Sequence, residues 1–372
     1  MRGQANDISR RSFLRRSMLG GAGVALTPIL DPVAAALAQV STRAKAPSIG
    51  VNVGYALRSD ETVANVKAFE MLVGRQVDFV TDYGAQVAWR ESVTSAVHAL
   101  RIWREVSVGS RRKMLWHQPL TIKGTPLSDV VAGKHDPVFE VIATNIRNAG
   151  FYDAIINLGW DMNGEWPAWS ATATTKDAYI DAYRRVAGIF KRISPSFRMC
   201  WSPARHTQAL APHDAYPGDA HVDLVGMTVH VVAPPLGPDM AEYFESNVIG
   251  HGAVPVAGRQ PYALAWLAEF AKLHDKRIVI PELAVGVDIP AGQPPEAAPI
   301  LDDDVIVTRL ADWITQNDVA LHCWRDMPNT EGSSLHSRMS RSSLVTGSKP
   351  SHPADERPRL STAYRKAWGS SS

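Results

Sequence analysis

Two acidic residues directly follow apolar stretches of the chain. Asp161 comes after the run Ala154–Trp160, and Glu282 comes after Ile278-Val279-Ile280-Pro281. A carboxylate next to a buried run is costly unless it is paired or used in a reaction. One such acid also fits a salt bridge or a loop cap. Two carboxyl groups that face each other can cleave a glycosidic bond, because one protonates the leaving oxygen while the other attacks the anomeric carbon or activates water.

Tryptophan is frequent in this chain, at 11 residues, and most of these residues lie near expected strand ends. Aromatic rings stack on the C–H faces of sugars, so tryptophans beside a pair of acids predict a carbohydrate subsite. Core packing is the alternative role for each ring. The residues expected to contact a sugar in this way are Trp116, Trp160, Trp166, Trp169, Trp201 and Trp324.

Three further polar residues are candidates for substrate contact: His117, Asn163 and His230. His230 ends an expected strand and is placed to hydrogen-bond Glu282, although a purely structural histidine fits the same position. The histidines lack the spacing of zinc motifs, and the chain has no phosphate-binding loop and no G-x-S-x-G nucleophile motif. The sequence therefore predicts no metal and no cofactor.

Short β-rich runs alternate with helical patterns along the chain, which places the two acids at strand ends. Most of the runs are continuously apolar, as is typical of parallel strands that are covered on both faces. The eight runs are Ser48–Val53, Val77–Asp82, Lys113–His117, Ala154–Trp160, Arg198–Ser202, Asp223–His230, Arg277–Glu282 and Val319–Trp324. The expected helices are Thr62–Val73, Asp136–Asn148, Lys176–Ile193, Pro261–His274, Asp302–Asn317 and Arg359–Trp368.

Eight such alternations predict an α/β fold with a single (β/α)8 TIM barrel, whose site lies at the carboxyl ends of the strands. A doubly wound open sheet is the alternative, but no Gly-rich phosphate loop follows the first run. The connections Val231–Gln260 and Arg325–Arg357 are long and are expected on the catalytic face. Cys200 and Cys323 lie within apolar runs and are expected to be buried and unpaired.

The N-terminus carries the pattern of a twin-arginine export signal. The motif Ser9-Arg10-Arg11-Ser12-Phe13-Leu14 precedes a weakly apolar run that ends on small residues at Ala38. We therefore expect residues 1–38 to be a signal peptide carried by the Tat translocase, and residues 39–372 to be the barrel domain. The expected location is the periplasm or the exterior, and the apolar run is too short for a permanent membrane anchor.

The charge balance argues against some classes of partner. The 39 basic and 37 acidic residues include five Arg and two Asp in residues 1–38, so 34 basic and 35 acidic residues remain. A nearly neutral domain is not suited to nucleic acid or anionic lipid. A polysaccharide or oligosaccharide is the expected partner, and a monomer is the expected state.

The stretch Gly159-Trp160-Asp161-Met162-Asn163-Gly164-Glu165-Trp166 resembles the acid-bearing segment of glycoside hydrolase family 26, the β-mannanase family of clan A. Pro281-Glu282 resembles the segment with the family's nucleophile, and weaker likenesses span most of the remaining chain. The resemblance implies an endo-acting, retaining hydrolase of a β-linked, mannan- or glucan-like polysaccharide. It also implies that Glu282 is the nucleophile, that Asp161 is the acid and later the base, and that Trp324 is a sugar platform.

This sequence departs from the family pattern at the acid, where the family has Glu and this chain has Asp161, and at Trp160, where mannanases tend to have His. The shorter Asp leaves several interpretations open. A backbone shift can close the gap, a water can fill it in an inverting reaction, or Glu165 can supply the proton instead. If the acid is lost, the protein is a carbohydrate-binding barrel without activity that serves exopolysaccharide handling.

Overall fold

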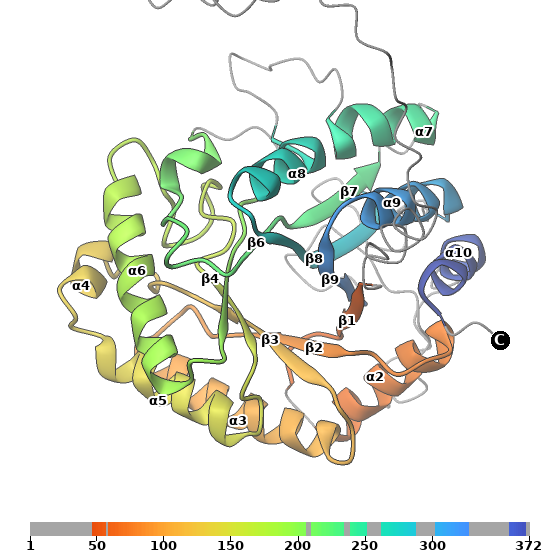
Figure 1. Cartoon of the computed structure of the whole chain (residues 1–372). Helices are drawn as coiled ribbons and strands as arrows, with labels where there is room; N and C mark the ends of the chain where they lie inside the picture. The colour runs from red at the N-terminus through yellow and green to blue at the C-terminus, as the bar shows by residue number, and fades with distance from the viewer. Residues whose placement is uncertain are drawn as a thin grey trace, which may run out of the picture. The chain divides into compact units, whose positions relative to one another are not determined.

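The computed structural model describes residues 47–56, 59–205, 210–233, 239–250, 262–287, 302–326 and 357–369. The predicted signal peptide lies outside the described residues. Parallel strands form a closed barrel, and helices surround it (Figure 1). The strands are β1 Ser48–Asn52, β2 Phe79–Tyr83, β3 Lys113–Gln118, β4 Ile155–Leu158, β5 Arg198–Trp201, β6 Leu224–Gly226, β7 Val229–Ala233, β8 Arg277–Val287 and β9 Val319–Arg325.

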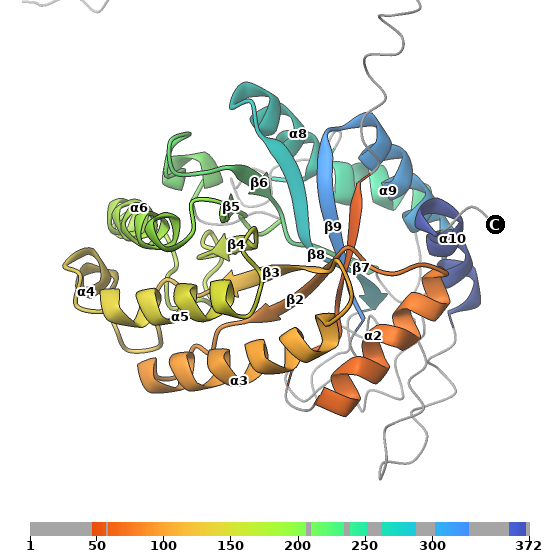
Figure 2. The same ribbon diagram turned by 60° about the horizontal axis from the view of Figure 1, so that its bottom comes forward.

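The sheet runs in the order β6-β5-β4-β3-β2-β1-β9-β8, and a parallel pairing of β6 with β8 closes it. β7 continues β6 after a break at residues 227–228 and also pairs with β8, so the barrel has eight strand positions. Figure 2 shows β1, β9 and β8 side by side. The prediction of a single (β/α)8 barrel is confirmed, and each of the eight predicted runs overlaps a strand.

The predicted helices are present with small changes at their ends, and α5 and α6 have the predicted bounds. The longest of the described helices, α3, was not predicted. Its buried face combines small residues such as Ser92 and Ala96 with the larger Leu100, Ile102 and Trp103. The main helices are α2 Ser59–Val73, α3 Trp89–Ser107, α5 Asp136–Asn148, α6 Lys176–Ile193, α8 Leu264–Leu273, α9 Asp304–Gln316 and α10 Pro358–Trp368.

Shorter helices lie on the connections. The segment after the sixth strand, predicted as one long connection from Val231 to Gln260, contains the end of β7 and two helical turns. The other long connection, Arg325–Arg357, lies almost entirely outside the described residues. No described helix is both long and apolar enough to span a membrane. The short helices are α4 Leu127–Val131, the 3-10 helix η1 Pro212–Ala215, α7 Met240–Tyr243 and the π-helix η2 Phe244–Ile249.

The core has two layers, because side chains alternate between the two faces of each strand. A small apolar cluster fills the barrel, and a larger one packs between the strands and the helices. Both cysteines are free and buried inside the barrel, as predicted. The inner cluster consists of Phe79, Leu115, Ile155, Cys200, Leu224, Val279, Leu321 and Cys323.

Candidate active site

Asp161 stands in the turn that leaves β4, and the backbone fixes its position. Its φ is +54°, a left-handed conformation that Asp tolerates better than most residues. Its N–H donates to the carbonyl of Ser202 (2.9 Å), and its own carbonyl accepts from the N–H of Gly164 (2.8 Å). Gly159, also at positive φ, starts the turn, and a side chain there would collide with Leu120.

The Asp161 carboxyl group is buried, with 7% of the residue exposed. Its Oδ1 has no hydrogen-bond partner among the described residues. Burial and the negative charge of Glu282 raise the pKa of Asp161 to about 8, and the nearby Thr228 hydroxyl offsets part of this rise. At neutral pH the group is therefore mainly protonated, which is the state required of a proton donor.

Glu282 lies within β8 and is equally buried, at 6% exposed. Its Oε2 is 3.3 Å from Nε2 of His230, and its Oε1 is 3.9 Å from Nδ1 of His117. Burial raises the pKa of Glu282, but the His230 hydrogen bond, His117 and the charge of Arg325 outweigh burial and lower the pKa to about 2. The carboxylate is therefore ionised at neutral pH.

A row of buried polar side chains lies next to Glu282. Ser202 Oγ donates to Asn157 Oδ1 (2.7 Å), and Asn157 Nδ2 lies 3.1 Å from His117 Nδ1. Because Asn157 uses its amide N–H on Nδ1, we assign the neutral His117 tautomer that carries its proton on Nε2. Burial lowers the pKa of His117 to about 4, which agrees with a neutral ring. His117 Nε2 is buried and has no hydrogen-bond partner within the described residues.

Tyr83, at the end of β2, belongs to the site but was not predicted. Its ring stacks on His117 with centroids 4.2 Å apart, and its hydroxyl accepts from Asn52 Nδ2 (2.6 Å). Burial and the adjacent Glu282 raise the pKa of Tyr83 well above its ordinary value. Its place at a strand end is the same signal that identified Asp161 and Glu282.

Asp82, the neighbour of Tyr83, is a third buried carboxyl group and was not predicted from the sequence. It accepts hydrogen bonds from Trp103 Nε1 (2.8 Å) and from the N–H groups of Tyr83 (2.7 Å) and Ala56 (3.1 Å). Burial raises the pKa of Asp82 to about 6, and the three hydrogen bonds offset part of this rise because they favour the ionised carboxylate. With its oxygens committed to neighbouring segments, Asp82 holds the ends of β1 and β2 together.

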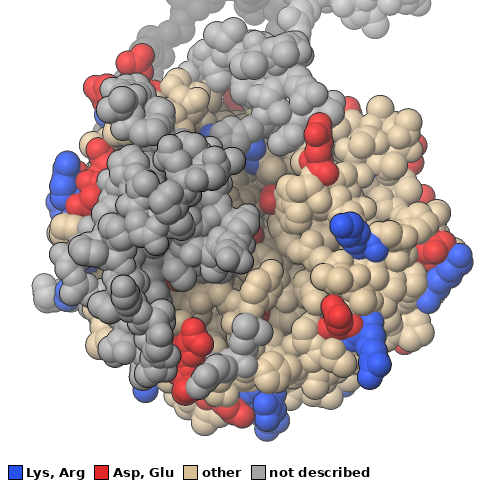
Figure 3. Space-filling model, turned by 180° about the vertical axis from the view of Figure 1, so that it is seen from behind, with Lys and Arg blue, Asp and Glu red and all other residues tan. Residues whose placement is uncertain are grey.

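The tryptophans of the loop after β4 gather beside Asp161. Trp160 is buried and meets His117 edge-on, and Trp169 donates its indole N–H to the Trp160 carbonyl (2.7 Å). Trp166 lies 6.0 Å from Trp160 between ring centroids and is 56% exposed. Of these three predicted sugar contacts, Trp166 offers the surface that a ligand can reach. Figure 3 looks toward the carboxyl ends of the strands and shows this face hollowed near its centre.

Three other tryptophans predicted to contact sugar pack elsewhere. Trp116, Trp201 and Trp324 are fully buried in the outer core. Trp201 packs on Phe270 of α8, and Trp324 packs on Tyr364 of α10. The reason is strand alternation: each follows or precedes an inward-facing residue and therefore points toward the helices. We assign all three to the core, including the expected Trp324 platform.

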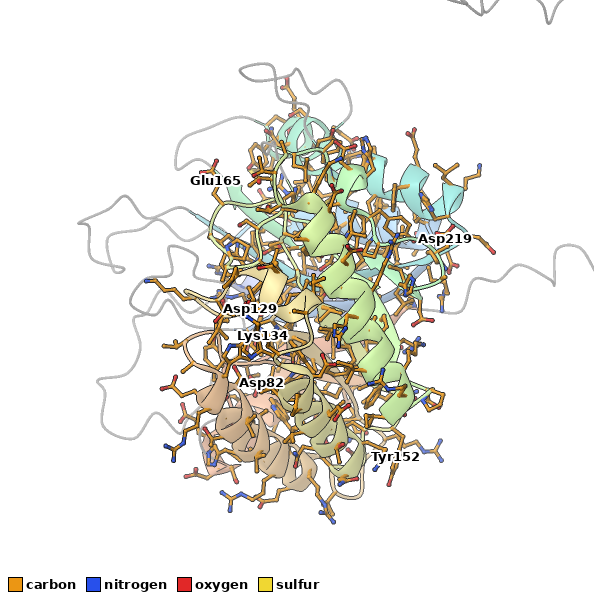
Figure 4. All side chains as sticks on the ribbon, turned by 90° about the vertical axis from the view of Figure 1, so that its left-hand side faces the viewer. Asp82, Asp129, Lys134, Tyr152, Glu165 and Asp219 are labelled. Atoms are coloured by element: carbon orange, nitrogen blue, oxygen red, sulfur yellow. The ribbon has the colours of Figure 1, made fainter. Side chains whose placement is uncertain are left out.

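Asn163 and Glu165, both in the loop after β4, have different surroundings. The Asn163 amide pairs with the backbone of Ala204 in both directions, so it joins two loops and is not directed at a ligand. Glu165 is exposed, and Figure 4 shows it at the outer edge of the molecule. The buried Asp161 is therefore the better proton donor. No cluster of three or more possible metal ligands is present among the described residues.

No protein-family model matches this chain, and no curated protein matches it either. Solved structures do. The catalytic domain of a family 26 endo-β-1,4-mannanase from Bacillus sp. JAMB-750 is 16% identical, with 87% of each chain covered and a TM-score of 0.57. A modular endo-β-1,4-mannanase from Cellulomonas fimi is 13% identical, with 85% of this chain and 70% of that chain covered and a TM-score of 0.55.

A fungal β-1,4-galactanase is 11% identical, with 86% of this chain and 99% of that chain covered and a TM-score of 0.55. At such identities the likeness establishes the fold. The chain thus has the barrel fold found in these β-glycoside hydrolases, and the buried carboxyl groups of Asp161 and Glu282 interact with each other.

Proposed function

We propose that this protein is a retaining, endo-acting glycoside hydrolase of a β-linked polysaccharide, with Asp161 as acid/base and Glu282 as nucleophile. One observation carries the proposal: two buried, interacting carboxyl groups have opposite surroundings, because Asp161 Oδ1 has no hydrogen-bond partner among the described residues whereas Glu282 Oε2 lies 3.3 Å from His230 Nε2. These surroundings raise the pKa of Asp161 to about 8 and lower the pKa of Glu282 to about 2. This pairing of a protonated and an ionised carboxyl is what glycoside cleavage needs. The mannanase and galactanase neighbours support the same class of reaction.

In the first step Asp161 donates its proton to the glycosidic oxygen while Glu282 attacks the anomeric carbon. The C–O bond to the leaving sugar breaks, and a covalent glycosyl–enzyme ester forms. In the second step the Asp161 carboxylate takes a proton from water, which attacks the same carbon and releases Glu282. His230 and Arg325 favour the ionised Glu282 that both begins and ends this cycle.

The proposal is tested with purified protein on mannans, xylans, glucans and galactans, with product lengths read by chromatography. Endo action yields a ladder of intermediate lengths. A 2-deoxy-2-fluoro glycoside of the preferred sugar should label the peptide that contains Glu282, detected as a mass increase. Proton NMR of the first product should show the β anomer. Tight binding of a polysaccharide without any cleavage would instead indicate the non-catalytic carbohydrate-binding barrel.

We also propose that the protein is exported by the twin-arginine pathway and acts in the periplasm or outside the cell. The support is the Arg10-Arg11 motif and the small-residue site at Ala38. Cell fractionation and N-terminal sequencing should find a mature chain that begins near Gln39. Changing Arg10 and Arg11 to Lys should keep the precursor in the cytoplasm, and unchanged export would refute this pathway.

A further inference from the structure

The segment Ser202–Arg205, which leaves β5, contacts the loop that carries Asp161. The carbonyl of Ser202 accepts the N–H of Asp161 (2.9 Å). Asn163 Nδ2 donates to the Ala204 carbonyl (3.1 Å), and Asn163 Oδ1 accepts the Ala204 N–H (2.8 Å). These three bonds fix the acid-bearing turn to the backbone of one neighbouring segment.

The same segment also contacts the residue that supports Glu282. Arg205 is 3% exposed, and its Nη2 donates to the carbonyl of His230 (2.6 Å). Its Nη1 donates to the carbonyl of Asn247 in the π-helix η2 (2.5 Å). The ring of His230 in turn approaches Glu282. Arg205 therefore fixes the backbone of the residue whose side chain holds the nucleophile.

The bonding of Arg205 is unusual for a buried cation. No carboxylate in the described part of the chain forms an ion pair with it. Its two Nη atoms donate to backbone carbonyls in separate segments, and the guanidinium also hydrogen-bonds the side chain of Tyr243. Burying a guanidinium costs free energy. A buried arginine that donates to the carbonyls of His230 and Asn247 and to the side chain of Tyr243 holds the segments that carry these groups at a set distance from one another.

We propose that Ser202–Arg205 is a positioning segment that sets the placement of Asp161 relative to Glu282, with Asn163 as its link to the acid and Arg205 as its link to the nucleophile. A role of this segment in catalysis rests on the proposed function, whereas its effect on the placement of the two carboxyl groups does not. If the links are broken separately, each should disturb mainly the carboxyl group on its own side.

The test is carboxyl ¹³C NMR titration of the protein in Asn163→Ala and Arg205→Met variants. In Asn163→Ala the acid turn loosens toward water, so the titration midpoint of Asp161 should fall from about 8 by about one pH unit or more. In Arg205→Met the His230 bond weakens, so the midpoint of Glu282 should rise from about 2 by a similar amount. Besides each other, these carboxyls face several charged or titratable groups: Tyr55, Tyr83, His117, Tyr179, His230, Cys323 and Arg325.

Matched controls are Asn148→Ala and Arg192→Met, two exposed residues on the helices, which should leave both midpoints unchanged. Arg205→Lys keeps the positive charge but loses the two separate Nη donors, so it should shift the Glu282 midpoint by an intermediate amount. This variant replaces Arg205→Met if Arg205→Met does not fold. Intact folding with both midpoints unmoved would overturn the proposal.

A kinetic readout links the segment to the reaction. Both variants should lower kcat about tenfold or more and change KM about twofold or less, because they disturb the placement of the reacting groups and not the exposed ring of Trp166. Normal carboxyl midpoints with reduced kcat would refute the positioning role. Absence of any hydrolysis by the unmodified protein would refute the proposed function, and the NMR titration would still test the segment.

Discussion

The buried carboxyl groups of Asp161 and Glu282 interact electrostatically, and their pKa values lie on opposite sides of the ordinary range. Burial without a strong donor raises the pKa of Asp161 to about 8. Burial acts on Glu282 too, but His230, His117 and Arg325 lower its pKa to about 2. The two groups are buried to a similar degree, so it is the neighbouring side chains that keep Asp161 protonated and Glu282 ionised.

The first prediction concerns the pH dependence of hydrolysis. Activity needs Asp161 protonated and Glu282 ionised, so kcat/KM should fall above about pH 8 and should stay high well below pH 5. Initial rates at low substrate concentration from pH 3 to 10 measure this, with circular dichroism to confirm that the protein stays folded. An alkaline limb near pH 5 would show that Asp161 is not the acid.

Glu282→Gln should abolish hydrolysis while the fold persists. Gln keeps the shape and the contact with His230 but cannot form the glycosyl ester, so kcat should fall about a thousandfold or more. The matched control is Glu165→Gln, which alters an exposed side chain of the acid loop and should leave kcat unchanged. If Glu282→Gln keeps its activity, the assignment of the nucleophile is wrong.

Asp161→Asn should affect substrates according to their leaving groups. A nitrophenyl leaving group departs without proton help, whereas a sugar needs the proton of Asp161. Cleavage of an oligosaccharide should therefore slow about a hundredfold or more, and the first step on an activated aryl glycoside should slow far less. Pre-steady-state bursts of nitrophenol isolate that step. Equal slowing of both substrates would contradict the acid role.

The same substitution should stabilise the protein at alkaline pH. The folded-state pKa of Asp161 is raised to about 8 from 3.8, so the native state binds the extra proton and wild-type stability falls as pH rises between these values. Asn carries no charge, so the variant should gain about 2 kcal/mol or more over wild type at pH 9 and little at pH 4. Urea unfolding at both pH values measures the gain; an equal difference at both would exclude this origin.

The positions of the catalytic candidates could be predicted because they depend on a simple rule. Carboxyl ends of parallel strands meet at one end of a barrel, so Asp161, Glu282, His117 and His230 were expected there from the order of the runs alone. Contacts between loops could not be predicted in this way. Arg205 lies in no recognisable pattern, and its carbonyl partners are set by how two distant loops pack.

The tryptophans illustrate a second limit. Strands that are buried on both faces are apolar at nearly every position, so their sequence does not reveal which residues point inward. A shift of one residue reverses the outcome: Cys200 lies inside the barrel, whereas Trp201 faces the helices. For the same reason the sequence could not show that Trp116 and Trp324 belong to the outer core. Trp166 lies in a loop, so this ambiguity does not apply to it.

This difference between exposed and buried tryptophans can be measured. Trp166→Ala removes a ring that is 56% exposed, so stability should change little, and KM for oligosaccharides should rise roughly fivefold from the loss of about 1 kcal/mol of stacking. Trp201→Ala instead empties a fully buried site against Phe270 and should cost about 3–5 kcal/mol of unfolding free energy. Urea unfolding and steady-state kinetics on both variants separate the two roles. If Trp166→Ala leaves KM unchanged, the exposed ring is not a sugar platform, and substrate must be held mainly by the polar groups around Glu282.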